Sequence, residues 1–173
     1  MRVLSLTSNE NARFYVQQVA KLRDLGVDTI TERNTGDQFA VQSRQSSRSP
    51  LAYVRFVPTV LRHAYGNYDL IHANYGLTAP AALPQSRLPV VLSLWGSDLM
   101  GSFGFLGKAS ARWCDEVIVM SSRMADRLGQ PCHVVPHGID LDLFEPKPAD
   151  EAARAVDWPD DTRNVFFPYA EER

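Results

Sequence analysis

Short apolar runs that alternate with amphipathic segments constrain the fold of this chain most strongly. Runs rich in Val, Leu and Ile begin near residues 2, 27, 69, 89, 116 and 133, and the segments between several of them have helical apolar spacing. Runs of this length are typical of strands. Because strands that alternate with helices build parallel sheets, the sequence predicts an α/β fold with a doubly wound, Rossmann-like parallel sheet.

Turn residues give the expected element boundaries. Thr7-Ser8-Asn9-Glu10 follows the first apolar run and matches the capping box, which predicts a helix starting directly after the strand. Its expected apolar face contains Tyr15, Val16 and Val19. Residues 32–49 are polar and predict a loop. A helix is expected from Pro50, with Val54 and Val57 on its apolar face and Pro58 kinking or shortening it.

Composition narrows the function classes. Eighteen basic and twenty acidic residues give a net charge of -2, which disfavours a nucleic-acid partner. The two cysteines, Cys114 and Cys132, lie beside apolar residues, as buried thiols do, and favour a reducing cytoplasm. No signal peptide and no apolar run long enough to span a bilayer is visible, so any membrane contact is expected to be peripheral. Arg44, Arg48, Arg55 and Arg62 are candidates for contact with an anionic acceptor or a membrane surface, but we favour a solvated helix face.

Four turns follow predicted strands and should meet at one edge of the sheet. In parallel sheets, ligands bind outside the carboxyl ends of the strands. The turns are Thr7–Glu10, His72–Gly76, Trp95–Asp98 and Pro136–Asp140. The candidate substrate-binding residues are therefore Asn9, Glu10, Asn74, Trp95, Gly96, Ser97, Asp98, His137, Gly138 and Asp140.

The turn after the fourth predicted strand allows two interpretations. In one, Trp95 stacks on a sugar, Gly96 admits the ligand, and Ser97 and Asp98 bind its hydroxyl groups. In the other, Asp98 caps a helix and Trp95 belongs to the core. Gly101, Gly104 and Gly107 follow and predict a loop that can move, but their spacing is not the dinucleotide fingerprint.

Histidines and carboxylates show no metal-ligand spacing, and no P-loop or nucleophile elbow is present. His137, in a loop, is a candidate donor to a phosphate or sugar oxygen, although such histidines are more often structural or exposed. His72 is more readily explained as a satisfied core residue than as a cleft residue. His133 is expected to be structural and His63 to be exposed on a helix.

Four segments, 69–74, 89–98, 115–122 and 135–146, together resemble the N-terminal domain of family 4 glycosyltransferases. The resemblance implies a retaining, metal-independent hexosyltransferase of the two-domain GT-B architecture. In that architecture the N-terminal domain binds a small-molecule, glycan or lipid acceptor. The C-terminal domain binds the nucleotide-sugar donor, and no further cofactor is implied. Residues 1–146 would be the acceptor-side domain, and 147–173 a linker and first strand of a truncated donor domain.

The chain departs from the family pattern at three points. Trp95 stands where the family usually has a histidine beside the transferred sugar, so no catalytic residue is assigned. Ser8-Asn9-Glu10 replaces a glycine-rich turn, and His137 replaces a common asparagine. We expect the chain alone to be inactive without its donor domain. The alternatives are a non-catalytic partner module of a split glycosyltransferase and, on fold alone, a nicotinamide-dependent oxidoreductase.

Overall fold

The structure is a computed structural model that describes residues 1–7, 12–29, 39–40, 50–141 and 143–159. The chain divides into two compact units, Met1–Gly138 and Ile139–Arg173. The first unit contains the sheet and six helices of the described residues, and the candidate site is built within it. In the second unit, the described helix is α7, Ala149–Ala155. The expected domain boundary after Pro146 stays a prediction.

The first unit is built on a seven-stranded sheet in which every described pair of strands is parallel. Its order is β2-β1-β4-β5-β6-β7, and β3 also pairs with β1. The strands are β1 (Arg2–Thr7), β2 (Asp28–Thr29), β3 (Phe39–Ala40), β4 (Leu70–Asn74), β5 (Val90–Leu94), β6 (Glu116–Val119) and β7 (His133–Val134). β2 and β3 both pair with one edge of β1, and β4, which comes next in the chain, pairs with the opposite edge of β1. This reversal confirms the predicted doubly wound sheet.

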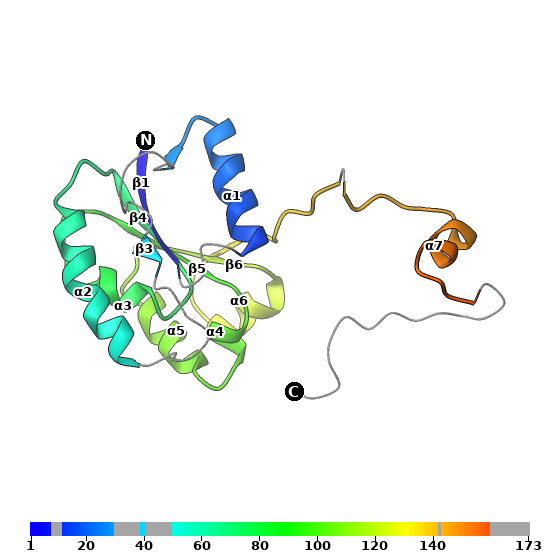
Figure 1. The fold of residues 1–173 in the computed structure, drawn as a ribbon. Helices are drawn as coiled ribbons and strands as arrows, with labels where there is room; N and C mark the ends of the chain where they lie inside the picture. Colours follow the sequence, from blue (N-terminus) through cyan, green and yellow to red (C-terminus); the bar gives the residue numbers. More distant parts are fainter. Residues whose placement is uncertain (8–11, 30–38, 41–49, 142, 160–173) are drawn as a thin grey trace. The chain divides into compact units, whose positions relative to one another are not determined.

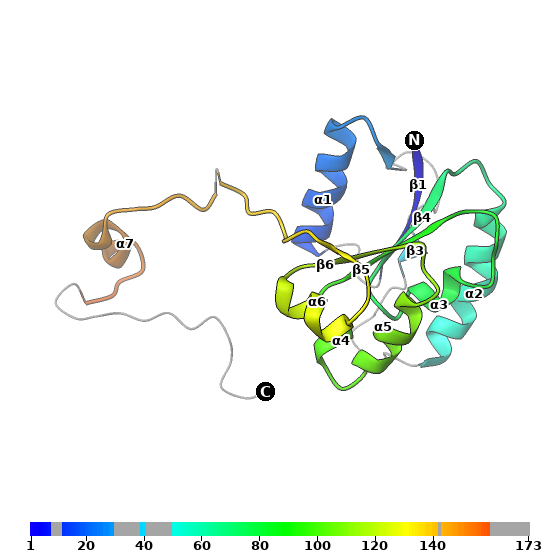
Figure 2. The same ribbon diagram turned by 180° about the vertical axis from the view of Figure 1, so that it is seen from behind.

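Helices cover the sheet unequally on its two faces (Figures 1 and 2). α1 (Arg13–Asp24) lies on one face. The other face carries α2 (Pro50–Ala64), α3 (Ala79–Ala82), α4 (Ser97–Met100), α5 (Gly104–Ala111) and α6 (Ser122–Leu128).

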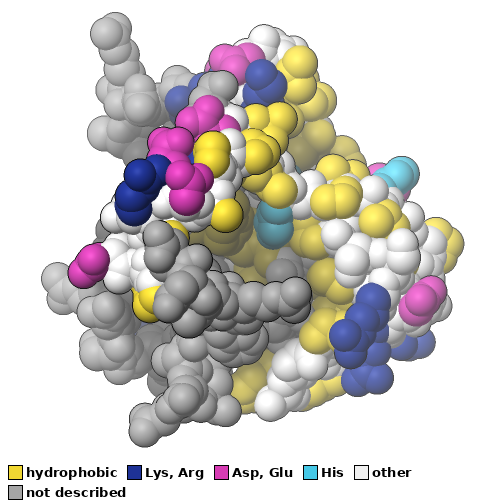
Figure 3. Space-filling view, turned by 90° about the vertical axis from the view of Figure 1, so that its right-hand side faces the viewer, with side chains coloured by type: hydrophobic (Ala, Val, Ile, Leu, Met, Phe, Trp, Pro, Cys, Tyr) yellow, Lys and Arg dark blue, Asp and Glu magenta, His cyan; other side chains and the backbone are white. Residues whose placement is uncertain are grey.

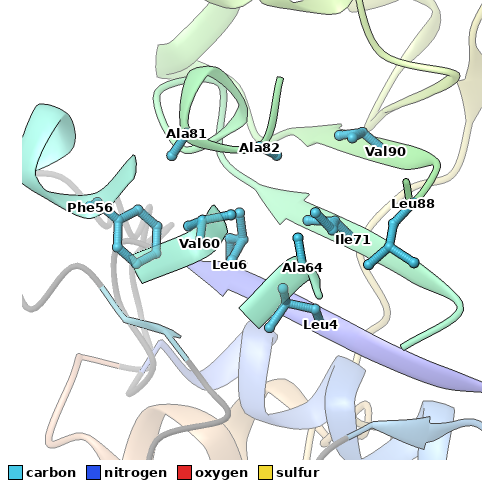
Figure 4. Close-up of a cluster of buried hydrophobic side chains, with 10 residues drawn as sticks. All are labelled: Leu4, Leu6, Phe56, Val60, Ala64, Ile71, Ala81, Ala82, Leu88 and Val90. Atoms are coloured by element: carbon cyan, nitrogen blue, oxygen red, sulfur yellow. The ribbon is translucent and has the colours of Figure 1, made fainter. Parts of the chain in front are cut away.

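The face under α2 to α6 holds the apolar core. Alternate residues of the strands point to this face, because side chains along a strand have a period of two. Leu4 and Leu6 of β1 pack with Ile71 of β4 and with Phe56 and Val60 of α2 (Figure 4). A second cluster continues the core below α4 to α6 and contains Leu92, Leu94, Leu99, Val117, Val119, Met124 and Leu128.

The face under α1 is markedly polar although it is buried. It carries Ser5, His72, Asn74 and Ser93, each less than a tenth exposed. His72 Nε2 lies 2.8 Å from Ser93 Oγ, and the Asn74 amide donates to Ser5 Oγ at 3.0 Å. The sheet is therefore held by dispersion on one face and by a hydrogen-bond network on the other.

α1 begins later than the capping box predicted. Its N-cap is Ala12, which offers no side-chain hydrogen bond, and Thr7 is the last residue of β1. Asn9 and Glu10 lie outside the described residues. Tyr15 and Val19 are buried as expected, whereas Val16 is exposed.

α2 matches its prediction in part: Val57 packs against the core as expected, but Pro58 neither kinks nor shortens the helix. It runs unbroken through Pro58 to Ala64, and its buried face is Phe56, Val60 and Ala64. Val54, expected on this face, is exposed. Residues spaced by four meet the sheet here, so the apolar stripe lies beside the predicted one. Pairing of Phe39–Ala40 with β1 also places a short strand inside the predicted loop.

The glycines expected to form a mobile loop instead pack two helices together. Gly104 and Gly107 lie in α5 and are buried. A Cβ atom on Gly104 would overlap the carbonyl oxygen of Leu99, and one on Gly107 would overlap that of Asp98. Glycine is needed here for close backbone approach, and the prediction of mobility at these two positions is wrong.

Candidate functional site

The turns after β4, β5 and β7 meet at the carboxyl edge of the sheet, as the parallel strand order requires. Thr7 at the end of β1 is in register with Asn74 at the end of β4, and Asn74 is in register with Ser93 of β5. Tyr75 and Trp95 therefore leave neighbouring strands side by side. His137 reaches the same place from the segment after β7.

Trp95 is the centre of an aromatic cluster at this edge. Its ring centroid lies 4.4 Å from that of Phe14 in an edge-to-face arrangement, 6.4 Å from Tyr75 and 6.3 Å from His137. Phe14 and His137 are themselves 4.9 Å apart, and Tyr15 lies 6.4 Å from Trp95. We call Phe14, Tyr15, Tyr75, Trp95 and His137 the aromatic cluster. Figure 3 views the side on which α1 and α6 lie, and hydrophobic side chains gather there with a histidine among them.

Asp98 holds the turns that carry two of these rings. Its carboxylate accepts hydrogen bonds from the backbone N–H of Trp95 at 2.9 Å, of Gly96 at 2.8 Å and of Gly76 at 2.8 Å. The side chain is 2% exposed, and desolvation by burial raises its pKa while these N–H groups lower it. Asp98 thus joins the turn after β4 to the turn after β5. The expected contact with a sugar hydroxyl stays a prediction.

Two residues in these turns have positive φ angles. Gly96 has φ +131°, which a residue without a Cβ adopts freely. Tyr75 also has φ 131°, and this conformation is strained for a side-chain-bearing residue. Its hydroxyl lies 3.4 Å from Ser97 Oγ. Strain of this kind persists only where the surroundings enforce it, and it clusters at binding sites.

Two buried polar atoms at this edge have no hydrogen-bond partner within the described part of the chain: Asn74 Oδ1 and Trp95 Nε1. Asn74 is 1% exposed, and its amide nitrogen is already bonded to Ser5 Oγ, which also bonds the Tyr15 hydroxyl at 2.7 Å. The network therefore fixes the Asn74 side chain. An unpaired buried acceptor or donor costs about 1–3 kcal/mol, and a ligand that pairs it recovers part of that free energy.

The two histidines of this region differ in surroundings. Burial lowers the pKa of His72 to about 4, so its ring is neutral at physiological pH and bonds Ser93. This agrees with the interpretation of His72 as a satisfied core residue. His137 is exposed, and partial desolvation against the aromatic cluster lowers its pKa. His133, expected to be structural, is exposed and pairs with Glu116 at 2.8 Å.

The structure brings together most, but not all, of the predicted substrate-binding residues. Asn74, Trp95, Gly96, Ser97, Asp98 and His137 belong to the turns described above. Gly138 ends the first unit, and nothing lies within 4 Å of where its Cβ would be. Asp140 belongs to the second unit, where its carboxylate accepts from the Leu143 N–H at 3.2 Å. Asn9 and Glu10 are not among the described residues.

Phe14, Tyr15 and Tyr75 were not predicted as site residues. Tyr15 was assigned to the core face of its helix, and it is indeed buried, with its hydroxyl turned toward Ser5. The signal that could have found Phe14 is its place near the start of the helix that follows the first strand, at the carboxyl edge of the sheet.

No group of three or more His, Cys, Asp or Glu residues that could hold a metal ion occurs among the described residues. Within the same residues, no helix is both long and apolar enough to cross a bilayer. Cys114 and Cys132 are free and half-buried, and burial raises the pKa of the Cys114 thiol to about 12. That thiol is therefore protonated and unreactive at neutral pH.

Comparison with solved structures identifies the fold. Sucrose-phosphate synthase from Thermosynechococcus elongatus superimposes with a TM-score of 0.66 at 18% sequence identity, over 93% of this chain and 54% of that chain. This chain thus spans about half the length of that enzyme. A second structure of the same enzyme gives a TM-score of 0.54 at 18% identity, over 80% of this chain and 90% of that chain. No curated protein sequence gives a significant match.

Sequence comparison identifies the family. The model for Glycosyltransferase Family 4 matches residues 11–143, which contain the turns after β4, β5 and β7 and all of the aromatic cluster. The structural similarity to sucrose-phosphate synthase agrees with the Rossmann-like parallel sheet. This chain belongs to glycosyltransferase family 4.

Proposed function

We propose that this chain is the acceptor-side domain of a metal-independent, retaining hexosyltransferase that uses a nucleotide sugar. The observation that carries the proposal is the convergence of three turns and the start of α1 around Trp95. Family membership supports sugar transfer, and the structural match to about half of a sucrose-phosphate synthase chain supports assignment to one half of a two-domain enzyme.

The chemistry of the aromatic cluster favours an acceptor over a nucleotide diphosphate. His137 is the only one of the rings around Trp95 that can become a cation, and desolvation by burial lowers its pKa, which favours the neutral ring. A diphosphate is normally bound by cationic side chains or by several backbone N–H groups. Here the N–H groups of Gly76, Trp95 and Gly96 are already bonded to Asp98.

In the proposed reaction, the bond between the anomeric carbon and the nucleotide phosphate breaks and a bond to an acceptor hydroxyl oxygen forms. The nucleoside diphosphate leaves, and the acceptor hydroxyl loses its proton. We assign no catalytic residue to this chain, because Trp95 occupies the position of the family's usual histidine and an indole N–H donates hydrogen bonds without exchanging its proton in catalysis.

Turnover of nucleotide sugars would test this proposal. The chain alone and the product of the complete reading frame that encodes it should be assayed in parallel against UDP-, GDP- and ADP-hexoses with a panel of acceptors. The proposal predicts no turnover by the chain alone and transfer once a donor-binding domain is present. Robust transfer by the 173-residue chain would contradict the acceptor-side assignment. Transfer that requires a separate polypeptide would instead identify the chain as a partner module of a split enzyme.

A further inference from the structure

α5 turns its large apolar side chains outward and buries small residues. The buried positions of this helix are Gly104, Gly107, Ser110 and Ala111. Phe105 and Leu106 are exposed, Phe105 to 65%. A helix on a sheet normally does the reverse, because burial of large apolar side chains stabilises the fold. The large apolar residues of α5 therefore contribute little to the core.

Further exposed apolar residues flank this helix. Phe103, its N-cap, is 63% exposed, and Met100 at the end of α4 is also exposed. Trp113 follows the helix and is 78% exposed, and its backbone N–H bonds the Ser110 carbonyl oxygen at 3.0 Å, so the helical turn continues to this residue. α4 and α5 lie side by side on one face of the sheet (Figures 1 and 2). We define the α5 surface as Met100, Phe103, Phe105, Leu106, Lys108, Arg112 and Trp113.

The charged groups of the α5 surface are both cations. Lys108 and Arg112 are exposed and spaced by four residues, which places them on one side of the helix, and Phe105 lies one turn before Lys108. No Asp or Glu occurs from residue 99 to residue 114. The flanking carboxylates of Asp98 and Asp115 accept hydrogen bonds from backbone N–H groups. Among the described residues, neither cation forms an ion pair.

The neighbouring helix extends the positive charge. Lys108 Nζ donates to the carbonyl oxygen of Arg127 in α6 at 3.2 Å, so the two helices are in contact. α6 has two exposed cations, Arg123 and Arg127, and one exposed carboxylate, Asp126. The whole chain has a net charge of -2. The charge of this part of the molecule is therefore opposite in sign to that of the chain as a whole.

This composition fits an anionic bilayer better than a protein partner. A symmetric dimer would pair the same surface twice and place Lys108 and Arg112 against their own equivalents, with no carboxylate to offset the repulsion. Lysine is depleted in the core of protein interfaces, whereas Lys108 lies in the middle of the α5 surface. At a bilayer, aromatic and aliphatic side chains enter the boundary of headgroups and acyl chains while Lys and Arg reach the lipid phosphates.

We propose that the α5 surface docks the protein on a bilayer that contains anionic lipids. Phe105 and Leu106 enter the boundary between headgroups and acyl chains, and Lys108 and Arg112 pair with lipid phosphates. The inference goes beyond the proposed function and does not depend on it, because it concerns the outer side of a helix and not the carboxyl edge of the sheet.

Binding to lipid vesicles tests the proposal. The complete chain is sedimented with sucrose-loaded vesicles of phosphatidylcholine alone and of phosphatidylcholine with an equal part of phosphatidylglycerol. We expect saturable binding to the anionic vesicles, binding to phosphatidylcholine that is weaker by about tenfold or more, and loss of binding as the salt concentration rises. Because the chain is acidic overall, attraction to an anionic bilayer requires a local cationic surface.

Two variants with matched controls assign the binding to the α5 surface. Arg112→Gln removes one cation and should weaken binding about fivefold, and Phe105→Ser removes an inserted ring and should weaken it about tenfold. Lys21→Gln and Leu25→Ser make the same kinds of change at exposed positions at the end of α1, on the opposite face of the sheet, and should leave binding unchanged. Circular dichroism checks that all four variants are folded.

Absence of binding to the anionic vesicles would overturn the proposal, as would equal affinities of the two variants and their controls. Self-association that Phe105→Ser abolishes, in place of vesicle binding, would assign the surface to a second copy of the chain. Binding that is lost in the product of the complete reading frame would also overturn the proposal, because another part of that protein would then cover the surface. Sugar transfer is measured separately, so a failure of the docking surface and a failure of the proposed function are distinguishable.

Discussion

The rings of Trp95 and His137 lie 6.3 Å apart, although one follows β5 and the other follows β7. In the sheet order, one strand, β6, lies between β5 and β7. Their meeting requires the crossovers to stack side by side in a parallel sheet. It is the structural basis for treating the carboxyl edge as one site.

Replacing Asp98 should lower the stability of the fold, because its buried carboxylate accepts hydrogen bonds from three backbone N–H groups. In Asp98→Asn, one oxygen still accepts from Trp95 and Gly96, but an amide NH₂ then faces the Gly76 N–H. We expect a loss of about 1–3 kcal/mol in the free energy of unfolding, the cost of an unsatisfied buried donor. Urea denaturation measures this loss.

Ser97→Ala, at the exposed neighbouring position, is the control and should change the free energy of unfolding by less than about 0.5 kcal/mol. Equal effects of the two variants would contradict this role of Asp98.

Gly107→Ala should destabilise the protein, against the usual effect of alanine in a helix. Alanine normally stabilises a helix interior by up to about 1 kcal/mol relative to glycine. At Gly107 its Cβ would overlap the Asp98 carbonyl oxygen, so we expect a loss of about 1–3 kcal/mol, as for an overpacked core. Thermal unfolding provides the comparison. Ala109→Ser, on the exposed side of α5, is the control, and a gain in stability from Gly107→Ala would show that α4 and α5 are not packed as described.

His72 should make folding stability depend on pH in the mildly acidic range. Its pKa is lowered from 6.5 to about 4 in the folded protein by burial, so below pH 6.5 the unfolded chain binds a proton that the folded chain does not. Stability from this group is complete above pH 6.5 and falls as pH drops toward 4, by roughly 3 kcal/mol in total, since each pKa unit corresponds to about 1.4 kcal/mol.

Urea denaturation at several pH values from 4 to 7.5 measures this dependence. His72→Asn should flatten the profile, and His133→Asn, at an exposed position, serves as its control. An unchanged slope in His72→Asn would mean that other groups cause the acid sensitivity.

Metal removal should leave sugar transfer unaffected. The proposed function places no step on a metal ion. Transfer by the complete enzyme should therefore retain its rate in excess EDTA, with Mg²⁺ and Mn²⁺ added back in parallel. A rate that falls with chelation and returns with either ion would contradict metal independence.

The alternation of strands and helices was predictable because buried parallel strands are short apolar runs. Four such runs coincide with β1, β4, β5 and β6. The buried face of α2 was not fully predictable from the sequence. Its apolar residues lie on more than one face of the helix, and packing against the sheet determines which face is buried. Gly104 and Gly107 were misjudged for a related reason. A glycine's role depends on which backbone approaches it, and the contact with α4 is set by tertiary packing.

The candidate site was predictable as a set of turns but not as a cluster of rings. Trp95 and His137 could be assigned to one edge because they follow parallel strands. Phe14 lies near the start of α1 and was missed because the capping box predicted an earlier start for that helix. The sequence also does not predict that the Asp98 carboxylate accepts hydrogen bonds from three backbone N–H groups. These bonds depend on how the turns after β4 and β5 pack against each other.

The most direct test of the convergence of these turns is the pH titration of the Trp95 indole N–H resonance in ¹⁵N-labelled protein. Protonation of His137 at 6.3 Å should shift that resonance with an apparent pKa below 6.5, because partial desolvation lowers the pKa of His137. The titration should disappear in His137→Asn, and the Trp113 resonance should not follow it in either protein. A Trp95 resonance that shows no step in this range, or one that persists unchanged in His137→Asn, would contradict the site.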